Sequence, residues 1–302
     1  MPKTISIPSR CTLCPRRCGA DRAAGRTGFC GAGATLKAAR AALHHWEEPC
    51  ISGTRGSGTV FFSGCTSSAA SARTIPSAPR AGQRDHRGAL GRDLFEFTGA
   101  GAHNINLVTP GQWQPWIIAA LDIARAKGLR LPIVCNTGGY ETVESVEAWR
   151  GYIDIWLADL NMCPLPCPQS FPPRRTICRG KPAIEAMMAQ AGHPVFDADG
   201  ILQKGVILRH LALPGHVEDS FAVLDQMAAW NDADPGCFLP SVMSQYTPFY
   251  KAAEHGIGRR ITTYEYRRVV NYAMDKGLVQ GYMQQKSSAK EEYTPSFDLT
   301  GV

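Results

Sequence analysis

The chain has 302 residues, of which 44% are hydrophobic and 19% charged, and it contains 11 cysteines. The apolar fraction excludes a mostly disordered chain, and 11 cysteines in so long a chain exclude a small disulfide scaffold. The net charge of +6 comes from 32 Lys and Arg against 26 Asp and Glu, without a long basic run. Nucleic-acid binding is therefore not predicted.

The hydrophobic residues are spread along the chain rather than gathered in one block. No stretch of 18 uncharged apolar residues is found, and residues 1–10 lack the apolar core of a signal peptide. We therefore expect a cytoplasmic protein without a membrane span. In that compartment cysteines serve as metal ligands or buried thiols more often than as disulfides.

A cysteine cluster is the first feature in chain order, within a predicted N-terminal extension over residues 1–54. Cys11, Cys14, Cys18 and Cys30 follow the spacing C-x2-C-x3-C-x11-C in a glycine-rich stretch. Four cysteines at such spacing suit a structural Zn²⁺ or an iron–sulfur cluster, and the spacing does not choose between them. Nearby arginines favour thiolate over thiol, or equally form a solvated basic face. The alternative is a set of free surface thiols.

Beyond residue 55, apolar runs alternate with helical patterns. We predict strands over 59–65, 104–110, 131–137, 153–159, 206–213 and 238–245. Helices are predicted over 113–127, 142–152, 181–191, 219–231 and 263–276, with Thr142 as an N-cap. This alternation predicts an α/β fold with a parallel sheet, wound either open or into a barrel.

Polar residues close several of these predicted strands. They are Cys65, Thr109, Asn136, Thr137, Asp159 and Gln245, while Arg209 and His210 lie within the fifth strand. Parallel folds place their chemistry at the carboxyl ends of the strands, so these positions are candidates for a site. For any single position, an ordinary capping or turn residue is the alternative.

Several motifs resemble those of radical SAM proteins related to pyruvate formate-lyase activating enzyme. The resemblance is carried by the N-terminal cysteine pattern and by residues 43–49, 53–65, 101–110, 132–141, 205–215, 241–246 and 260–266. It implies a partial (β/α)6 barrel over residues 55–285, followed by a tail over 286–302. It also implies an activase-like or peptide-modifying enzyme that produces a 5′-deoxyadenosyl radical from S-adenosylmethionine.

That chemistry uses a [4Fe–4S] cluster on a C-x3-C-x2-C loop after the first strand, where three thiolates leave one iron open. Here Cys65 is present, but the second and third positions are Ala69 and Ala72. A single thiolate does not hold such a cluster. The segment from residue 66 to about 98 also lacks the apolar periodicity of the helix expected after a first strand.

We interpret this departure as a shift of reading frame over residues 66–98. An alanine codon begins with GC. When the preceding codon ends in T, the three bases TGC across the boundary form a cysteine codon one base out of frame, and this can occur at both Ala69 and Ala72. We interpret residues 162–180 in the same way. If one base is restored at the codons of Asn161 and Met162, these codons encode Lys-Tyr, the pair that the family has at this place. The alternative for this second segment is a genuine Pro- and Cys-rich loop, in which Cys163, Cys167 and Cys178 would form a metal site.

The resemblance also implies site residues and partners. Cys65 would be the surviving cluster ligand, and Thr109, Asn136, Thr137 and His210 would line the S-adenosylmethionine side of the barrel mouth. Arg209 would pair with the methionyl carboxylate, or else form a structural ion pair. Because side chains alternate along a strand, Arg209 and His210 cannot both face the barrel interior.

An electron donor such as flavodoxin or ferredoxin is the implied partner, and the substrate is not readable. The competing interpretation is a non-catalytic metal-binding protein, with Zn²⁺ or an iron–sulfur cluster at the N-terminal cysteines and the barrel as a scaffold. An out-of-frame segment would expose apolar surface on the sheet, so the literal chain is expected to be poorly soluble.

Overall fold

A computed structural model describes residues 5–66, 83–84, 87–161, 180–248 and 252–284. Most of its strands join one mixed sheet, in the order β10-β9-β8-β6-β5-β4-β2-β1-β3, and β7 pairs with β8 off this path. The strands are β1 (Lys37–His44), β2 (Ser57–Phe62), β3 (Gln83–Arg84), β4 (Ile105–Val108), β5 (Ile133–Thr137), β6 (Ile155–Asp159), β7 (Val195–Phe196), β8 (Leu202–Leu211), β9 (Leu239–Met243) and β10 (Tyr282–Met283).

The helices follow the strands in regular alternation. They are α1 (Pro49–Ser52), α2 (Arg87–Gly99), α3 (Gln114–Ala126), α4 (Val143–Ala148), α5 (Lys181–Ala191), α6 (Val217–Ala233) and α7 (Thr263–Asp275), with short 3₁₀ turns at Gly111–Trp113 and Ala253–His255. Each predicted strand and helix overlaps an element of the structure, while β1, α1 and α2 were not predicted. Thr142 caps α4 by accepting a 3.1 Å hydrogen bond from the Ser145 amide. Among the described residues, no helix is long and apolar enough to cross a bilayer.

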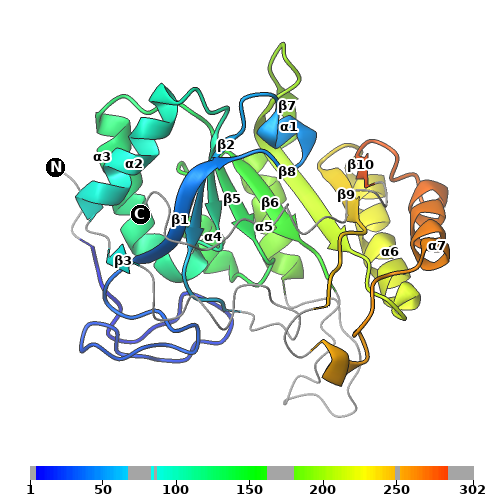
Figure 1. The fold of residues 1–302 in the computed structure, drawn as a ribbon, viewed down its shortest axis with the longest axis horizontal. Coiled ribbons are helices and arrows are strands. Elements are labelled where there is room, and N and C mark those ends of the chain that lie inside the picture. Colours follow the sequence, from blue (N-terminus) through cyan, green and yellow to red (C-terminus); the bar gives the residue numbers. More distant parts are fainter. Residues whose placement is uncertain (1–4, 67–82, 85–86, 162–179, 249–251, 285–302) are drawn as a thin grey trace.

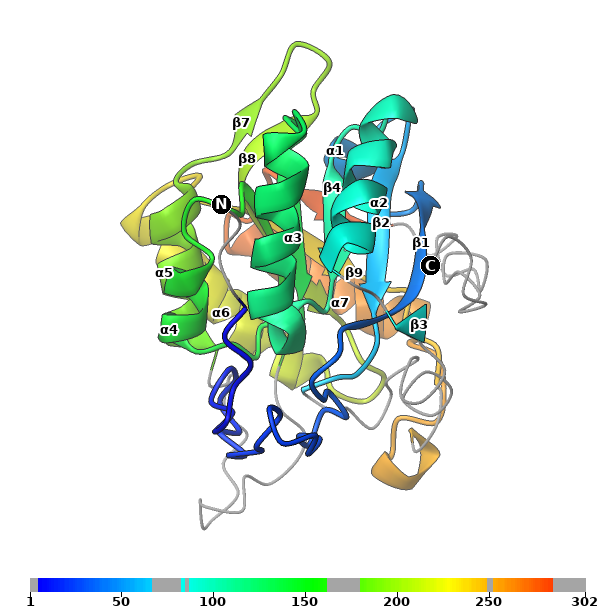
Figure 2. The ribbon, with the colours of Figure 1, turned by 90° about the vertical axis from the view of Figure 1, so that its left-hand side faces the viewer.

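Strands β2, β4, β5, β6, β8 and β9 lie in chain order across the sheet, and each neighbouring pair is parallel. Parallel crossovers are right-handed, so a sheet whose order never reverses collects its helices on one face. Figures 1 and 2 show α2 to α7 arranged along that face. We call the opposite face the open face. All the parallel strands end at the same rim of the sheet.

The main core lies between the sheet and these helices. Ile117, Leu121, Trp149 and Trp156 are among its fully buried side chains. A smaller core lies on the open face, where Ile51 of α1 packs with residues of β5, β6 and β8. Burying a side chain such as Ile51 contributes about 1.5–3 kcal/mol. The short helix α1 therefore fixes the preceding segment against the open face.

Helix α2 corrects one expectation. Residues 66–98 were expected to contain no helix, yet α2 covers Arg87–Gly99. Its buried side chains Leu90, Leu94 and Phe97 are spaced for one helix face. Gly58 of β2 makes room for this packing, because a Cβ there would lie 2.5 Å from the Phe97 ring. Residues 67–82 and 162–179, including Ala69, Ala72 and the three cysteines of the second segment, lie outside the described residues.

Candidate functional site on the open face

A row of polar side chains crosses the open face near its rim. Asp159 of β6, Arg209 of β8 and Ser241 of β9 lie directly opposite one another in register. Side chains at paired positions of neighbouring strands share one face of a sheet. The row therefore brings an acid, a guanidinium and a hydroxyl together on the open face.

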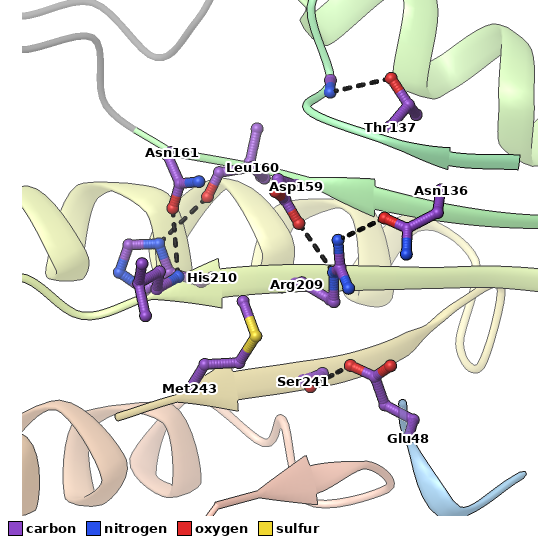
Figure 3. A network of polar contacts seen from close by, with 12 residues as sticks. Glu48, Asn136, Thr137, Asp159, Leu160, Asn161, Arg209, His210, Ser241 and Met243 are labelled. Atoms are coloured by element: carbon purple, nitrogen blue, oxygen red, sulfur yellow. Dashed lines mark hydrogen bonds and ion pairs between the residues drawn. The ribbon is translucent and has the colours of Figure 1, made fainter. Parts of the chain in front are cut away.

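Arg209 stands at the centre of a buried network, which Figure 3 shows in part. Its Nε donates to Asp159 Oδ1 at 2.7 Å, and one terminal nitrogen donates to Asn136 Oδ1 at 2.8 Å. The other terminal nitrogen lies 3.3 Å from Glu47 Oε2. Despite its burial, these neighbouring carboxylates raise the pKa of Arg209. The Arg209 guanidinium is thus bound by side chains of this protein. This arrangement matches the structural ion pair that the sequence analysis gave as the alternative to binding a methionyl carboxylate.

Glu47 and Glu48 enter the open face from the segment that precedes α1. Glu47 Oε1 accepts hydrogen bonds from the side-chain amides of Asn106 at 3.2 Å and Asn136 at 3.1 Å. Burial raises the pKa of both glutamates, and the charge of Arg209 opposes that rise. The network therefore carries more carboxylates than cations.

A cavity of about 470 Å³ opens beside Glu48. Glu48 Oε1 accepts a 3.0 Å hydrogen bond from Ser241. Its second oxygen, Oε2, is buried and has no hydrogen-bond partner among the described residues. Part of the cavity wall is apolar, formed by Trp46, Met243 and Met283. The structure thus places Glu48, a carboxyl group with one unpaired and buried oxygen, among the residues that line an open, partly apolar cavity.

Glu141, which follows the carboxyl end of β5, provides a further buried carboxyl group. Thr137 Oγ1 donates a hydrogen bond to Glu141, and the other Glu141 oxygen has no partner among the described residues. Burial raises the pKa of Glu141 to about 7, the charge of Asp159 adds to the rise, and the Thr137 hydroxyl opposes it. Glu141 therefore titrates near neutral pH.

Thr109 closes β4 in a strained backbone conformation. Its φ is 51°, a region that β-branched residues rarely adopt. The Thr109 hydroxyl donates to the neighbouring Val108 carbonyl at 2.8 Å, and the Thr109 backbone amide donates to the Asn136 carbonyl at 2.8 Å. Thr109, Asn136 and Thr137 therefore gather at the carboxyl ends of β4 and β5, as the sequence predicted.

His210 lies on the other face of the sheet and does not join this network. One ring nitrogen lies 3.0 Å from the Leu160 carbonyl oxygen and the other 2.9 Å from Ser220 Oγ on α6. Burial lowers the pKa of His210 to about 4, so the ring is neutral at neutral pH. Its expected place at the barrel mouth is wrong, because the alternation of β8 turns Arg209 to the open face and His210 to the helices.

The four N-terminal cysteines line one small cavity. Its other walls include Arg16, Arg22, Gln112 and Thr66, the residue after Cys65. Arg22 is fully buried, donates to the carbonyls of Gly33 at 2.9 Å and Gln112 at 2.7 Å, and also interacts with the Cys11 thiol. The structure thus brings the cysteine cluster and the Cys65 loop side by side.

The Cys65 loop is held tightly at this junction. Gln112 Nε2 donates to the carbonyls of Ser63 at 3.2 Å and Gly64 at 3.1 Å, and Arg16 Nε donates to the Thr66 carbonyl at 2.7 Å. Gly64 has a φ of 90°, and a Cβ there would lie 2.5 Å from the Cys30 carbonyl oxygen. Only glycine fits this contact.

The cysteine thiols themselves are not arranged as a finished metal centre. Across the described ranges, no group of three or more His, Cys, Asp or Glu side chains is placed to hold a metal ion. Burial raises the pKa of both Cys14 and Cys30. Thiolates are the form that binds metals, so these two thiols would need a cation to lose their protons at neutral pH.

Sequence reasoning missed the carboxylates Glu47, Glu48 and Glu141 as site residues. A pair of adjacent glutamates directly before a proline was the available signal for the first two. Their contacts lie far away in the chain, since Glu47 and Arg209 are separated by 162 positions. No local pattern reports such a contact.

Comparison with known proteins places the chain near one relative of unassigned function. No family model matches the chain. It is 24% identical over 280 residues to the uncharacterized protein MJ0674 of Methanocaldococcus jannaschii, an alignment that covers 89% of this chain and 75% of the relative. The likeness therefore extends over most of the chain, but that relative is itself uncharacterized.

Proposed function

We propose that this chain has the partial (β/α)6 barrel of radical SAM proteins related to pyruvate formate-lyase activating enzyme. The observation that supports it is the strand order: six parallel strands follow the chain across the sheet, each with a helix after it. A doubly wound sheet reverses its order and has helices on both faces. The single direction found here fits a partial barrel better than a doubly wound sheet, and it leaves one face of the sheet for a site.

Residues at the rim support the same assignment. The loop that bears Cys65 follows the first of these strands, and Thr109 and Thr137 end the next two. The strained backbone of Thr109 fits a functional rim, since such strain collects at sites. S-adenosylmethionine binding would fall to this rim, through the Thr109, Asn136 and Thr137 side of the open face.

The cluster loop of the literal chain does not fit a [4Fe–4S] cluster. Cys65 offers one thiolate, while positions 69 and 72 carry methyl groups that bind no iron. We therefore assign the radical chemistry to the ancestral reading frame and not to the chain as written. Because α2 buries Leu90, Leu94 and Phe97 on one helix face, we narrow the out-of-frame segment from residues 66–98 to about residues 66–86.

Anaerobic reconstitution with iron and sulfide tests the proposal. The literal chain is expected to load iron only at the N-terminal cysteines. A frame-restored chain, which includes Ala69→Cys and Ala72→Cys, is expected to bind a further four-iron cluster and to cleave S-adenosylmethionine when reduced. Sequencing the gene across codons 60–100 and 158–182 provides the independent check. A restored chain that does neither would overturn the enzyme assignment.

A second candidate function is metal binding without catalysis. The observation that favours it is the gathering of Cys11, Cys14, Cys18 and Cys30 around one cavity beside the buried Arg22. Four thiols suit Zn²⁺ or an iron–sulfur cluster, and metal binding would require the thiols to rearrange, since the described residues hold no finished metal-binding group. The reconstitution above separates the two candidates, because metal at these cysteines does not depend on positions 69 and 72.

A further inference from the structure

The open-face cavity and Glu48 point to the class of ligand that the site takes. Glu48 is 7% exposed, and its Oε2 has no partner among the described residues although the side chain lines a cavity of about 470 Å³. Buried carboxylates cost several kcal/mol unless cations or protons compensate them. Arg209 lines the same cavity and its charge favours ionised Glu48, but this one guanidinium is shared with Asp159 and Glu47, so three carboxylates face one cation in the network.

We propose that this cavity binds a primary alkylammonium group, such as the side chain of a peptidyl lysine or a free alkylamine, with Glu48 Oε2 as its acceptor. This ligand would be the substrate of the open face. That it undergoes a reaction rests on the proposed function, whereas its binding rests only on the geometry of Glu48 and of the cavity walls.

The number of open oxygens selects ammonium over guanidinium. Guanidinium groups pair with carboxylates through two parallel hydrogen bonds, which need both oxygens. Ser241 occupies Glu48 Oε1 at 3.0 Å, so a single oxygen is left. An ammonium is a point charge that binds one oxygen well. Ser241 is therefore a positioning residue that sets the specificity of Glu48.

The cavity walls suit an aliphatic stem. Trp46, Met243 and Met283 supply apolar surface, and Tyr282 adds a second aromatic ring. Methionine packs around unbranched chains with little cost, and aromatic faces attract cations. Gln245 and Gln284 are also among the residues that line the cavity. A charged head at Glu48 with a methylene chain along these walls matches this distribution.

Binding is measured on the full chain without iron, S-adenosylmethionine or reductant, so the result does not depend on radical chemistry. The probes are Nα-acetyl-lysine amide, Nα-acetyl-norleucine amide and Nα-acetyl-arginine amide, followed by ligand-detected NMR. The lysine probe is expected to bind at least about 10-fold more tightly than the other two. Equal binding of the norleucine probe would overturn the proposal.

Two variants assign the interaction to Glu48. Glu48→Gln keeps the shape of the side chain and is expected to weaken the lysine probe about 10- to 100-fold, while the exposed control Glu147→Gln leaves it unchanged. Ser241→Ala retains the Glu48 charge and frees Oε1. It is expected to narrow the preference for lysine over arginine, a change that a merely structural role would not cause. An unchanged preference would overturn the role of Ser241, and an unchanged affinity in folded Glu48→Gln would overturn the site.

Two further arms identify the source of the ammonium group. Pentylamine that binds as tightly as the lysine probe assigns the cavity to free amines, and weaker binding assigns it to peptidyl lysine; both support the alkylammonium site. S-adenosylmethionine also carries an ammonium group. If it displaces the lysine probe and Glu48→Gln abolishes its binding, the cavity belongs to the cofactor and the substrate assignment is overturned.

Discussion

Arg209 and Asp159 lie opposite each other on neighbouring parallel strands and share a 2.7 Å hydrogen bond between Nε and Oδ1. The side chain of Arg209 is 12% exposed, and Glu47 approaches it at 3.3 Å from the other side. One guanidinium therefore compensates carboxylates from two distant parts of the chain. This buried network depends on Arg209 for its charge balance.

Removing that cation is expected to destabilise the fold strongly. Arg209→Met leaves Asp159 and Glu47 without compensation, which should lower the free energy of unfolding by about 3–5 kcal/mol. The control is Arg268→Met, which removes a surface pair with Glu218 whose side chains are 42% and 75% exposed. That change should cost about 0–1 kcal/mol. Urea unfolding of both variants measures the difference, and equal effects would contradict a buried network.

Glu141 predicts a pH dependence of stability. Burial raises its pKa from 4.5 to about 7, so the folded chain keeps a proton that the unfolded chain has released between these values. Fewer protons on the unfolded state make the free energy of unfolding fall as pH rises from about 5 to 7, after which the loss is complete.

Glu141→Gln isolates this contribution. The stability of the variant relative to the parent should rise across that window by up to about 3 kcal/mol, the free energy of the shift. Chemical denaturation at several pH values measures it, with Glu147→Gln on the exposed side of α4 as the control. A parent and variant whose stabilities run parallel with pH would show that Glu141 titrates normally.

The order of strands and helices could be predicted from the sequence because the apolar pattern of several elements and the residues that flank them indicate the same secondary structure. Residues 155–158 form an apolar run that is buried on both faces, and the helix Lys181–Ala191 is flanked by Gly180 and Gly192. Helix α2 was not readable in the same way. Its apolar positions Leu90, Leu94 and Phe97 are separated by Gly, Arg, Asp and Glu, and its exposed Phe95 blurs the period.

The site was readable only on the strands. Asn136, Thr137 and Arg209 were found because a polar residue in an apolar strand is unusual. Glu47 and Glu48 come from the segment before α1 and reach the same point through the fold, a relation that no spacing rule encodes. Because side chains alternate along a strand, the sequence showed that Arg209 and His210 point to opposite faces. Only the structure showed that Arg209 is the one on the open face.

Helix α2 yields a test of the reading frame. Leu94 is fully buried against the main core, so Leu94→Ala should cost about 2–5 kcal/mol of unfolding free energy. The adjacent Phe95 is 36% exposed, and Phe95→Ala should cost less. Thermal unfolding of the two variants makes the comparison. Similar small effects would mean that residues 87–99 do not pack as an in-frame helix and would extend the altered segment to residue 98.

The N-terminal cysteines predict a pH-dependent metal site. Because burial raises the pKa of Cys14 and Cys30, zinc must displace their protons, so its affinity should increase as pH rises. The parent should bind about one zinc ion per chain, as a four-thiolate site does. Cys30→Ser should lose it, while Cys237→Ser, a buried thiol on the far side of the core, should retain it. Metal analysis after dialysis at several pH values measures both effects. Zinc retained by Cys30→Ser, or lost equally by both variants, would show that the cysteine cluster is not the ligand set.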